Sequence, residues 1–468
     1  MVAHKLAGAP LDFAALRGEL EVPGEFPPDV RAEAATVAKS PVLPDDDATD
    51  IPFVTVDPAG SRDLDQAVHI GQASDGGYLV SYAIADVAAF VRPGSALDAE
   101  AMRRGETLYF PDQRVPLHPP TLSEGAASLL PGEVRPAVLW QITLDATGNP
   151  VHVDVRRARV RSRQQLDYVG LQQAVDAGTA PEAIALLPKV GVLRQQLGRQ
   201  RHAINLDLPE QIVEGDAQHG WTLLFRDQLP VEQYNAEISL LTGTCAAALM
   251  LQAGFGILRT VPAPDRGAIA ALHRIAPALG IQWPDGAPPG DVLATLDRKN
   301  PKHVAFLDHA GSLLRGSAYT PFDGTPPAQP LHAGVAAPYA HVTAPLRRLV
   351  DRFGSEICLA AQAKQPVPDW VRERVPQLPD AMAEADHRAH EVDRAVVDTT
   401  EAWLLAGRIG QTFQATVLDA DEKAATVAID EPAVRARCSG ADLPVGQQLG
   451  VRLIEADTAS RTVRFELA

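Results

Sequence analysis

Residues 238–258, ISLLTGTCAAALMLQAGFGIL, run for 21 residues without a charged side chain. A helix of this length is long enough to span a bilayer, so the segment is typical either of a membrane protein or of a large buried core. It contains four polar side chains and three glycines, and no other segment of the chain resembles it. We therefore predict a buried core helix that ends near Gly254, in a soluble protein that is not inserted in a membrane.

The composition limits the classes of function. The chain has 468 residues, of which 46% are hydrophobic, which suits about two to four domains. Its formal net charge is −17, the opposite sign to that of proteins with a broad basic surface for nucleic acid, so any such contact needs a local basic channel. The three cysteines form no CxxC pair, and the N-terminus has no long apolar core. These features exclude a disulfide framework and a cysteine-rich zinc site, and they predict a cytoplasmic protein.

The spacing of apolar residues divides the chain into three parts. Residues 1–50 predict a short helical region, and a helix-turn-helix-like unit is one interpretation of it. Residues 51–405 start with short β-like runs and continue with helical periodicity, which predicts an α+β domain. Between these parts, the acidic run at 41–52 predicts a linker with solvated aspartates. In residues 406–468, five short β segments separated by turn residues predict an OB-fold barrel.

Three aspartates are crowded into the segment VTVDPAGSRDLDQAVHI, residues 54–70. Asp57 ends a β-like run, and an extended RDLDQ segment after the PAGS turn would place Asp63 and Asp65 on one side. Carboxylates held together repel one another, and a divalent cation removes that conflict. Oxygen ligands without histidine or thiolate favour Mg²⁺ or Mn²⁺, which can act in phosphodiester cleavage. Aspartates that cap a surface turn are the alternative explanation.

Four later segments appear in the order of a known domain. They are IADVAAFV (84–91), TLYFPDQRVPLHPPTLSEGAASLLPGEVRPAV (107–138), LRTVPAPD (258–265) and AAPYAHVTAPLRRLVDR (336–352). With the aspartate run, they resemble the RNB catalytic domain of the ribonuclease II family over residues 20–405. This resemblance implies a mixed β-sheet surrounded by helices, followed by an S1-like RNA-binding barrel. It also implies a short form that lacks the family's N-terminal cold-shock domains.

The resemblance implies a function as well as a fold. It implies a Mg²⁺-dependent, processive 3'→5' exoribonuclease that hydrolyses RNA to 5'-mononucleotides in RNA decay and processing, with Mn²⁺ as a substitute metal. The expected partner is RNA with a free 3' end, and the expected state is a monomer. One alternative, a metal nuclease that also cleaves DNA, stays open at this point.

The resemblance also implies roles for individual residues. As metal ligands or catalytic groups it implies Asp57, Asp63, Asp65, Gln66 and Arg347. As RNA-binding residues it implies Tyr109, Tyr168, Glu237, Arg348 and Asp393, with Glu391 as the alternative to Asp393. Arginine suits the scissile phosphate because its guanidinium binds oxygen pairs, and ribose contacts suit RNA because only RNA carries the 2'-OH.

Gln66 departs from the family pattern, because the family usually carries a fourth aspartate there. An amide oxygen still ligates Mg²⁺ but brings no charge, so metal should bind more weakly. The alternative function is therefore a catalytically weakened RNA-binding protein of the same fold.

Two arginine clusters are candidates for the basic channel. Arg157, Arg159, Arg161 and Arg163 alternate along one segment, and Arg194, Arg199 and Arg201 form the second cluster. Alternate residues of a strand share one side, so the first cluster predicts a stripe that follows RNA phosphates. A solubilising surface stripe is the alternative.

Overall fold

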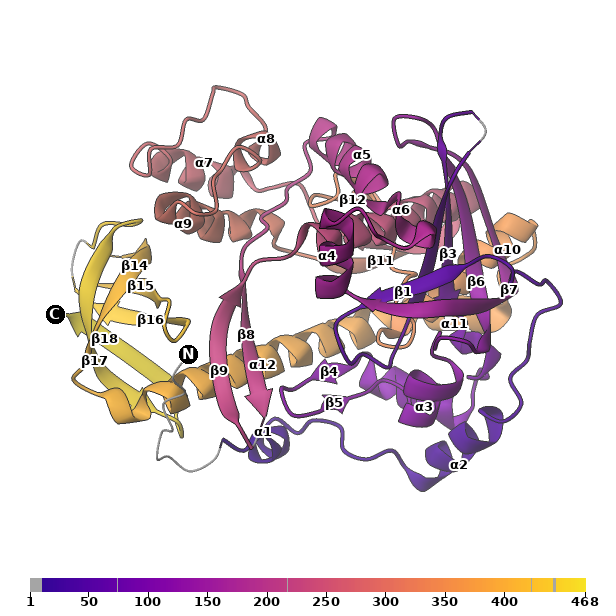
Figure 1. Ribbon diagram of the computed structural model, residues 1–468, viewed down its shortest axis with the longest axis horizontal. Helices are drawn as coiled ribbons and strands as arrows, with labels where there is room; N and C mark the ends of the chain where they lie inside the picture. The colour runs from indigo at the N-terminus through magenta and orange to yellow at the C-terminus, as the bar shows by residue number, and fades with distance from the viewer. Residues whose placement is uncertain (1–10, 74, 217, 422, 441–442) are drawn as a thin grey trace.

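The computed structural model of the chain describes residues 11–73, 75–216, 218–421, 423–440 and 443–468. Two closed β-barrels lie toward opposite ends of the long axis, and helices and short hairpins lie between them (Figure 1). The first barrel carries the aspartate run. The second barrel is formed by the last part of the chain.

The first barrel contains five strands. They are β1 (Phe53–Asp57), β2 (Gln66–Gln72), β3 (Tyr78–Ala85), β6 (Val134–Leu144) and β7 (Pro150–Asp167), hydrogen-bonded in this order. Neighbouring strands are antiparallel, except that β7 and β1 run parallel and close the barrel. The sheet is therefore mixed, as predicted, and it is also closed.

Strand β3 shows why this sheet is covered on both faces. Val80 and Tyr82 point into a hydrophobic cluster shared with helix α6, whereas Ala83 and Ala85 point into a second cluster shared with helices α2 and α3. Successive side chains of a strand point to opposite faces, so β3 is apolar nearly throughout.

The uncharged segment forms helix α6 (Pro230–Ala253), which ends at Gly254 in the left-handed conformation (φ 73°) that glycine adopts without strain. It packs against α5, α10 and β10, and Ser239 hydrogen-bonds Tyr82 of the barrel (Oγ to Oη, 2.8 Å). Among the described residues it is the one helix long and apolar enough to cross a membrane. Its buried residues belong to the largest hydrophobic cluster, so the predicted core helix is confirmed.

The remaining helices surround the first barrel and connect it to the second. They are α1 (Phe13–Glu19), α2 (Pro28–Val37), α3 (Ala96–Arg104), α4 (Tyr168–Asp176), α5 (Leu187–Gln200), α7 (Arg266–Ile275), α8 (Pro289–Leu293), α9 (Pro301–Ala310), α10 (Leu349–Ala363), α11 (Asp369–Arg374) and α12 (Leu378–Leu405). The helix α12 runs from the region of the first barrel to the second and contacts strands of both the hairpins and the second barrel (Figure 1).

Four two-stranded antiparallel sheets complete the described part of the body, and three of them are hairpins of strands that follow each other directly in the chain. They are β4 (Leu108–Tyr109) with β5 (Arg114–Val115), β8 (Glu210–Asp216) with β9 (Gly220–Arg226), β10 (Phe255–Thr260) with β11 (Ala318–Asp323), and β12 (Leu331–His332) with β13 (Ala337–Pro338). The β4–β5 hairpin is important for the site because Tyr109 and Arg114 are cross-strand partners in it.

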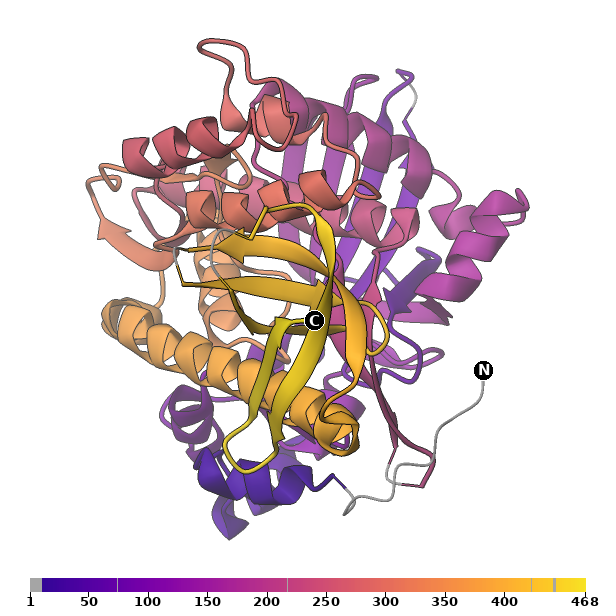
Figure 2. The same cartoon turned by 90° about the vertical axis from the view of Figure 1, so that its left-hand side faces the viewer.

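The second barrel has the five predicted strands. They are β14 (Thr412–Ala420), β15 (Ala424–Ile429), β16 (Val434–Ser439), β17 (Gln448–Asp457) and β18 (Thr462–Leu467), in the order β14-β15-β16-β18-β17. Figure 2 views this barrel from its own side of the molecule, with α12 alongside it. Glu401 of α12 fixes the junction, because its Oε1 accepts hydrogen bonds from Gln211 Nε2 of β8 (2.6 Å) and Arg435 N of β16 (2.8 Å).

The sequence predicted that the aspartates of the acidic linker are solvated, but two of them form ion pairs with strand β7. Asp46 Oδ2 pairs with Arg156 Nε of β7 (2.6 Å), and Asp47 Oδ2 pairs with Arg159 Nη2 (3.3 Å). The linker therefore lies along the barrel. The composition of the linker alone could not predict that its aspartates pair with arginines of β7.

Candidate active site

The aspartate run lines a pocket of about 380 Å³. Its lining residues are Asp57, Pro58, Ala59, Ser61, Asp63, Asp65, Gln66, Tyr109, Arg114, Tyr168 and Arg347. These residues come from four separate parts of the chain. The pocket therefore brings together the three aspartates, Gln66 and three of the other residues that the family resemblance implies.

Strand pairing explains why these parts meet. Asp57 ends β1 and Gln66 begins the neighbouring antiparallel strand β2, so the loop between them lies at one end of the barrel. In the parallel β1–β7 pair, Asp57 lies opposite Asp167, which caps α4 by accepting a hydrogen bond from Gly170 N (2.8 Å). Tyr168 is the first residue of α4, so the same register places it beside Asp57.

The loop itself is fixed by hydrogen bonds on both sides. Ser128 Oγ donates to Arg62 O (2.6 Å) and accepts from Leu64 N (3.0 Å), and Gln165 Nε2 donates to Ser61 O (2.8 Å). The carboxylates are consequently presented by an ordered backbone, which is what a preorganised site requires.

Asp65 is the most enclosed of the three carboxylates, with 2% of its surface exposed. Its Oδ1 accepts from Leu346 N (2.7 Å), and its Oδ2 accepts from Arg347 Nε (3.2 Å). Burial raises the pKa of Asp65 to about 8, against the opposing effect of the Arg347 guanidinium. In the absence of a cation, this carboxyl group therefore gains a proton far more readily than a solvated one.

Asp57 has a different environment. Its Oδ2 is buried and has no hydrogen-bond partner. Burial raises the pKa of Asp57 to about 7, Arg347 opposes the shift, and Asp63 adds to it. A buried carboxylate oxygen without a donor is costly unless a ligand satisfies it.

Asp63 is held by the β4–β5 hairpin. Arg114 Nη1 forms an ion pair with Asp63 Oδ1, and Tyr109 Oη donates to Asp63 Oδ2 (3.4 Å). Tyr109 is 45% exposed and is one of the residues that line the pocket. Sequence reasoning missed Arg114; its position opposite Tyr109 in the turn FPDQR was the signal that could have identified it.

Gln66 turns its amide group toward the body of the protein. Its Nε2 donates to Thr343 O (2.5 Å), so its Oε1 is the atom left to accept a hydrogen bond or ligate a cation.

Three residues that the resemblance implies as RNA-binding lie outside this pocket. Arg348 is committed to Asp351, with Nε to Oδ2 at 2.5 Å and Nη2 to Oδ1 at 2.8 Å. Glu237 lies on α6 near Arg194 and Arg201, which lower its pKa against the larger raising effect of burial. Asp393 is an exposed residue of α12. None of these three lines the pocket that holds the aspartates.

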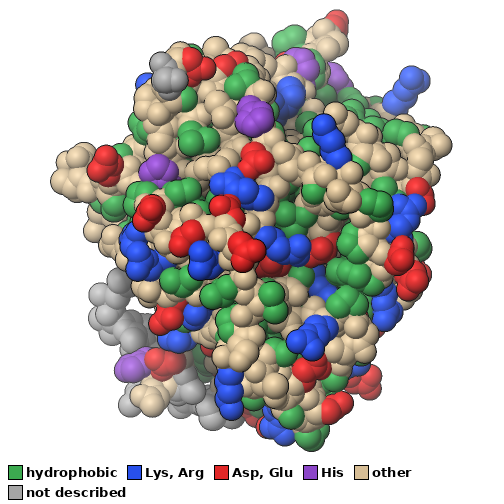
Figure 3. Space-filling model, turned by 90° about the vertical axis from the view of Figure 1, so that its right-hand side faces the viewer, with side chains coloured by type: hydrophobic (Ala, Val, Ile, Leu, Met, Phe, Trp, Pro, Cys, Tyr) green, Lys and Arg blue, Asp and Glu red, His purple; other side chains and the backbone are tan. Residues whose placement is uncertain are grey.

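Two arginines of the expected phosphate-tracking stripe along β7, Arg157 and Arg159, are paired with carboxylates in the structure. Arg157 pairs with Asp86 (Nε to Oδ2, 2.7 Å) and with Glu356, and Arg159 pairs with Asp47. Figure 3 views this side of the molecule and shows cationic and anionic side chains intermingled, with no continuous basic band. Alternation along the strand was correct, but partners distant in the sequence neutralise the charge.

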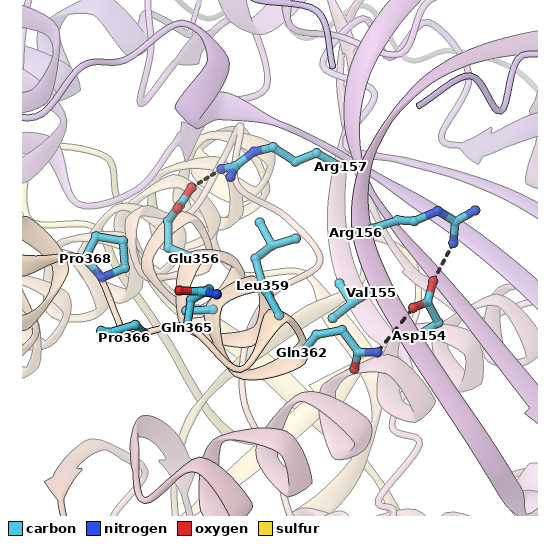
Figure 4. Close-up of a pocket in the computed structure, with 12 residues that line it drawn as sticks. Asp154, Val155, Arg156, Arg157, Glu356, Leu359, Gln362, Gln365, Pro366 and Pro368 are labelled. Carbon is cyan, nitrogen blue, oxygen red and sulfur yellow. Dashed lines mark hydrogen bonds and ion pairs between the residues drawn. The ribbon is translucent and has the colours of Figure 1, made fainter. Parts of the chain in front are cut away.

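A larger pocket, of about 580 Å³, lies elsewhere, between β7 and α10 (Figure 4). Arg157 and Glu356 pair at its edge, and Asp154 accepts hydrogen bonds from Arg156 Nη1 (2.5 Å) and Gln362 Nε2 (3.2 Å). Its charged side chains are thus paired, and it contains none of the aspartates of the candidate site.

The pocket offers oxygen ligands of the kind that hard divalent cations prefer. The side chains present are hard oxygen donors, and the buried, unpartnered Asp57 Oδ2 together with Gln66 Oε1 fits such an ion. However, within the described part of the chain no group of three or more His, Cys, Asp or Glu side chains converges as a metal cluster. Guanidinium groups occupy oxygens of Asp63 and Asp65 instead.

Comparisons with known proteins agree with this architecture. Residues 46–355 match the RNB domain, and residues 411–468 match the RNase II-type exonuclease C-terminal S1 domain. The chain is 27% identical over 399 residues to exoribonuclease 2 of Serratia proteamaculans (strain 568), an alignment that covers 81% of this chain and 60% of that relative. The chain thus spans less than two thirds of the length of this curated relative.

Solved structures show the same fold. RNase R of Mycoplasma genitalium, in complex with ribose-methylated single-stranded RNA, is similar with a TM-score of 0.86 at 20% identity, over 97% of this chain and 77% of that chain. Yeast Ssd1, described as a pseudonuclease, is similar with a TM-score of 0.68 at 18% identity, over 88% of this chain and 52% of that chain. Because the RNB match alone spans more than half of its residues and the S1 match follows in order, the chain belongs to the RNB-domain family of ribonuclease II-type proteins.

Proposed function

We propose that this protein is a Mg²⁺-dependent, processive 3'→5' exoribonuclease that hydrolyses RNA to 5'-mononucleotides, with Mn²⁺ as a substitute metal. The observation that carries the proposal is the pocket in which Asp57, Asp63 and Asp65 face Arg347 and Tyr109. Carboxylates, a guanidinium and an open aromatic ring are the groups that a phosphodiester, its metal and its terminal base require. The fold relative from M. genitalium is bound to single-stranded RNA, which supports RNA as the substrate.

Each side chain has a role that its position supports. Arg347 uses Nε to hold Asp65, and its guanidinium lines the pocket, where it can bind the scissile phosphate and stabilise developing charge. Tyr109 supplies a ring for stacking on a base near the 3' end. Tyr168 lines the pocket together with Asp57 and can contact the ribose.

Asp57 and Gln66 are the residues that would hold Mg²⁺, which would supply an activated water and polarise the phosphate. The residues of the chain do the rest: Asp65 holds Arg347 in place through Oδ2 and fixes the 346–347 backbone through Oδ1. This division predicts that Asp65 matters for turnover more than for RNA affinity.

We place the protein in the cytoplasm as a monomer. Cys245, Cys358 and Cys438 are buried free thiols, which suits a reducing compartment.

The second candidate function is RNA binding with weakened or lost hydrolysis. Two observations favour it: Gln66 brings no charge to the pocket, and Arg114 occupies Asp63. The fold is also similar to that of a pseudonuclease.

One experiment separates these functions. A 5'-labelled single-stranded RNA is incubated with the protein in Mg²⁺ and in Mn²⁺, beside a DNA of the same sequence. Direct accumulation of a short 5' fragment from RNA alone supports the exoribonuclease. Intact RNA in both metals, with measurable binding, supports the binding protein, and equal loss of DNA supports a nonspecific nuclease.

A further inference from the structure

Two arginine side chains of the pocket share one pattern of contacts. Arg347 uses Nε to pair with Asp65 Oδ2, and Arg114 uses Nη1 to pair with Asp63 Oδ1. Both side chains are partly open, at 49% exposed for Arg347 and 30% for Arg114. Within the described part of the chain, no oxygen accepts a hydrogen bond from the other nitrogens of either guanidinium. Each guanidinium is thus anchored at one nitrogen and keeps donors for a ligand.

Arg348 and Arg352 show the contrasting pattern. Arg348 bonds both oxygens of Asp351 through Nε and Nη2, and Arg352 bonds Asp98 through Nη1 and a backbone carbonyl through Nη2. Neither of these side chains lines the pocket of the candidate site. Their nitrogens are used within the protein, whereas the unused donors of Arg114 belong to a residue that lines the pocket.

Arg114 also lies next to the ring that is proposed to stack on a base. Tyr109 and Arg114 are cross-strand partners in the β4–β5 hairpin, and side chains directly opposite one another in an antiparallel pair have Cβ atoms about 5 Å apart. Both contact Asp63, Arg114 through Oδ1 and Tyr109 through Oδ2. A nucleotide whose base stacks on Tyr109 therefore brings its sugar-phosphate backbone near Arg114.

The chemistry of a 3' end decides which phosphate Arg114 can meet. Release of a 5'-mononucleotide cleaves the chain at its last phosphate, and Arg347 is the residue proposed above to bind that phosphate. An RNA that ends in a 3' hydroxyl has no phosphate beyond it, so a second guanidinium in the same pocket meets the neighbouring phosphate on the 5' side.

We propose that Arg114 binds the phosphate that precedes the scissile one and so fixes the position of the RNA 3' end in the pocket. The proposal rests on the function proposed above and adds a substrate-binding residue to it. Arg114 can hold Asp63 and a phosphate together, because Asp63 uses only Nη1. The Nε and Nη2 donors form one edge of the planar guanidinium, and such an edge fits a pair of phosphate oxygens.

Uncharged linkages test this contact one phosphate at a time. A short 5'-fluorescein-labelled single-stranded RNA carries one methylphosphonate at its last linkage, at its second-last linkage or in the middle of the strand. The nucleotide on the 5' side of the modified linkage is 2'-deoxy, which keeps that linkage intact, and each reference strand has the same deoxyribose with an ordinary phosphate. Fluorescence anisotropy with the full-length chain in EDTA measures affinity without hydrolysis.

We expect the uncharged second-last linkage to weaken binding by wild type about tenfold, because one charge-assisted contact is lost. Arg114→Gln should bind the unmodified RNA about tenfold more weakly and should lose less than about twofold more when the second-last linkage is uncharged, since both changes remove the same contact. The slope of log Kd against log salt should fall by about 0.7 in this variant. The last linkage should stay sensitive, because Arg347 is still present.

Three further variants separate this role from other effects. Arg31→Gln removes a cation from an exposed pair with Glu25 outside the pocket, so it should keep the linkage dependence of wild type. Arg114→Lys keeps the charge without the planar edge, so it should keep the salt slope and recover part of the linkage effect. Tyr109→Phe removes the hydroxyl that contacts Asp63 and keeps both the ring and the guanidinium, so it should keep the linkage dependence. Far-UV circular dichroism verifies that each variant is folded.

The proposal is overturned if the second-last linkage is no more sensitive than the middle one in wild type, or if Arg114→Gln loses as much at that linkage as wild type does. Loss of the linkage dependence in Tyr109→Phe would also overturn it, because Arg114 would then act only by ordering the hairpin. Wild type that binds no RNA refutes the proposed function as well. A protein that shows the expected linkage pattern but does not cleave RNA would refute hydrolysis and leave the role of Arg114 intact.

Discussion

Arg17 of α1 forms a two-fold ion pair with Asp112, at the tip of the hairpin that carries Tyr109 and Arg114. Arg17 Nη1 lies 2.7 Å from Asp112 Oδ1, and Nη2 lies 3.1 Å from Oδ2. The Arg17 guanidinium also lies over the ring of Phe110, 5.1 Å from its centroid. The N-terminal helix therefore contacts the β4–β5 hairpin, which contributes Tyr109 and Arg114 to the candidate active site.

The same helix is tied to the second barrel. Glu19 accepts two hydrogen bonds from Arg461, with Nη1 to Oε2 at 2.9 Å and Nη2 to Oε1 at 2.8 Å. Phe13 and Leu16 of α1 pack in a cluster with Leu108 of β4 and Val392 of α12. A short N-terminal helix thus joins the hairpin, the long helix and the second barrel.

We expect Arg17→Ala to weaken RNA binding at the hairpin, with the KM for single-stranded RNA rising about three- to tenfold. The free energy of unfolding should fall by only about 1 kcal/mol, because a partly exposed ion pair contributes little. Steady-state cleavage assays and urea unfolding measure the two effects. Glu19→Gln is the matched control, since it removes the other ion pair of α1 and should leave the KM unchanged.

Asp65→Asn should lower the kcat for RNA cleavage by about a thousandfold, while RNA affinity stays within a few fold. An asparagine keeps an oxygen for Leu346 N but lacks the charge that pairs with Arg347 Nε. Single-turnover cleavage and filter binding separate the two quantities. An equal loss of binding would mean that Asp65 is structural, not catalytic.

Gln66→Asp should lower the stability of the metal-free protein. It should also increase the stabilisation that added Mg²⁺ gives. The substitution removes the Nε2 donor from Thr343 O and leaves a buried acceptor facing a carboxylate, at a cost of about 1–3 kcal/mol. The added charge should in turn strengthen Mg²⁺ binding. Thermal unfolding with and without Mg²⁺ measures both effects.

Gln66→Asn is the control for this substitution, because it shortens the side chain without adding charge. It should lose stability and show the Mg²⁺ response of wild type. If Gln66→Asp responds to Mg²⁺ no more than Gln66→Asn does, residue 66 does not contribute to a metal site.

Glu401 should make stability depend on pH. Burial raises the pKa of Glu401 from 4.5 to about 7, although hydrogen bonds from Arg435 N and Gln211 Nε2 oppose the shift. The folded state therefore holds a proton that the unfolded state has lost. The resulting stabilisation is fully present below pH 4.5 and is lost as the pH rises through about 7, a change on the order of 3 kcal/mol.

Glu401→Gln tests this assignment. Both hydrogen bonds end on Oε1, which a glutamine retains, so the substitution removes the titration and keeps the contacts. Urea unfolding at pH 5 and pH 8 should show a smaller pH difference for the variant than for wild type. Equal differences in the two proteins would show that other groups govern the pH dependence.

The sequence alone determined the elements whose causes are local. Five short β segments separated by turn residues predicted the strands of the second barrel, and the uncharged segment predicted the helix that ends at Gly254. The order of motifs around Asp57 and Arg347 also indicated residues that share one pocket. Periodicity and turn residues act over a few positions, so the chain displays them directly.

Only the tertiary structure decided which charges neutralise one another. Arg114 and Asp63 are 51 positions apart, and Arg347 and Asp65 are 282 apart, yet each pair forms one contact. Arg157 and Arg159 of β7 follow the predicted alternation, but Asp86 and Glu356 pair with the first and Asp47 pairs with the second. The physical reason is that an ion pair depends on distance in space, and the closure of the barrel and the packing of the hairpin set that distance, which spacing along the chain does not.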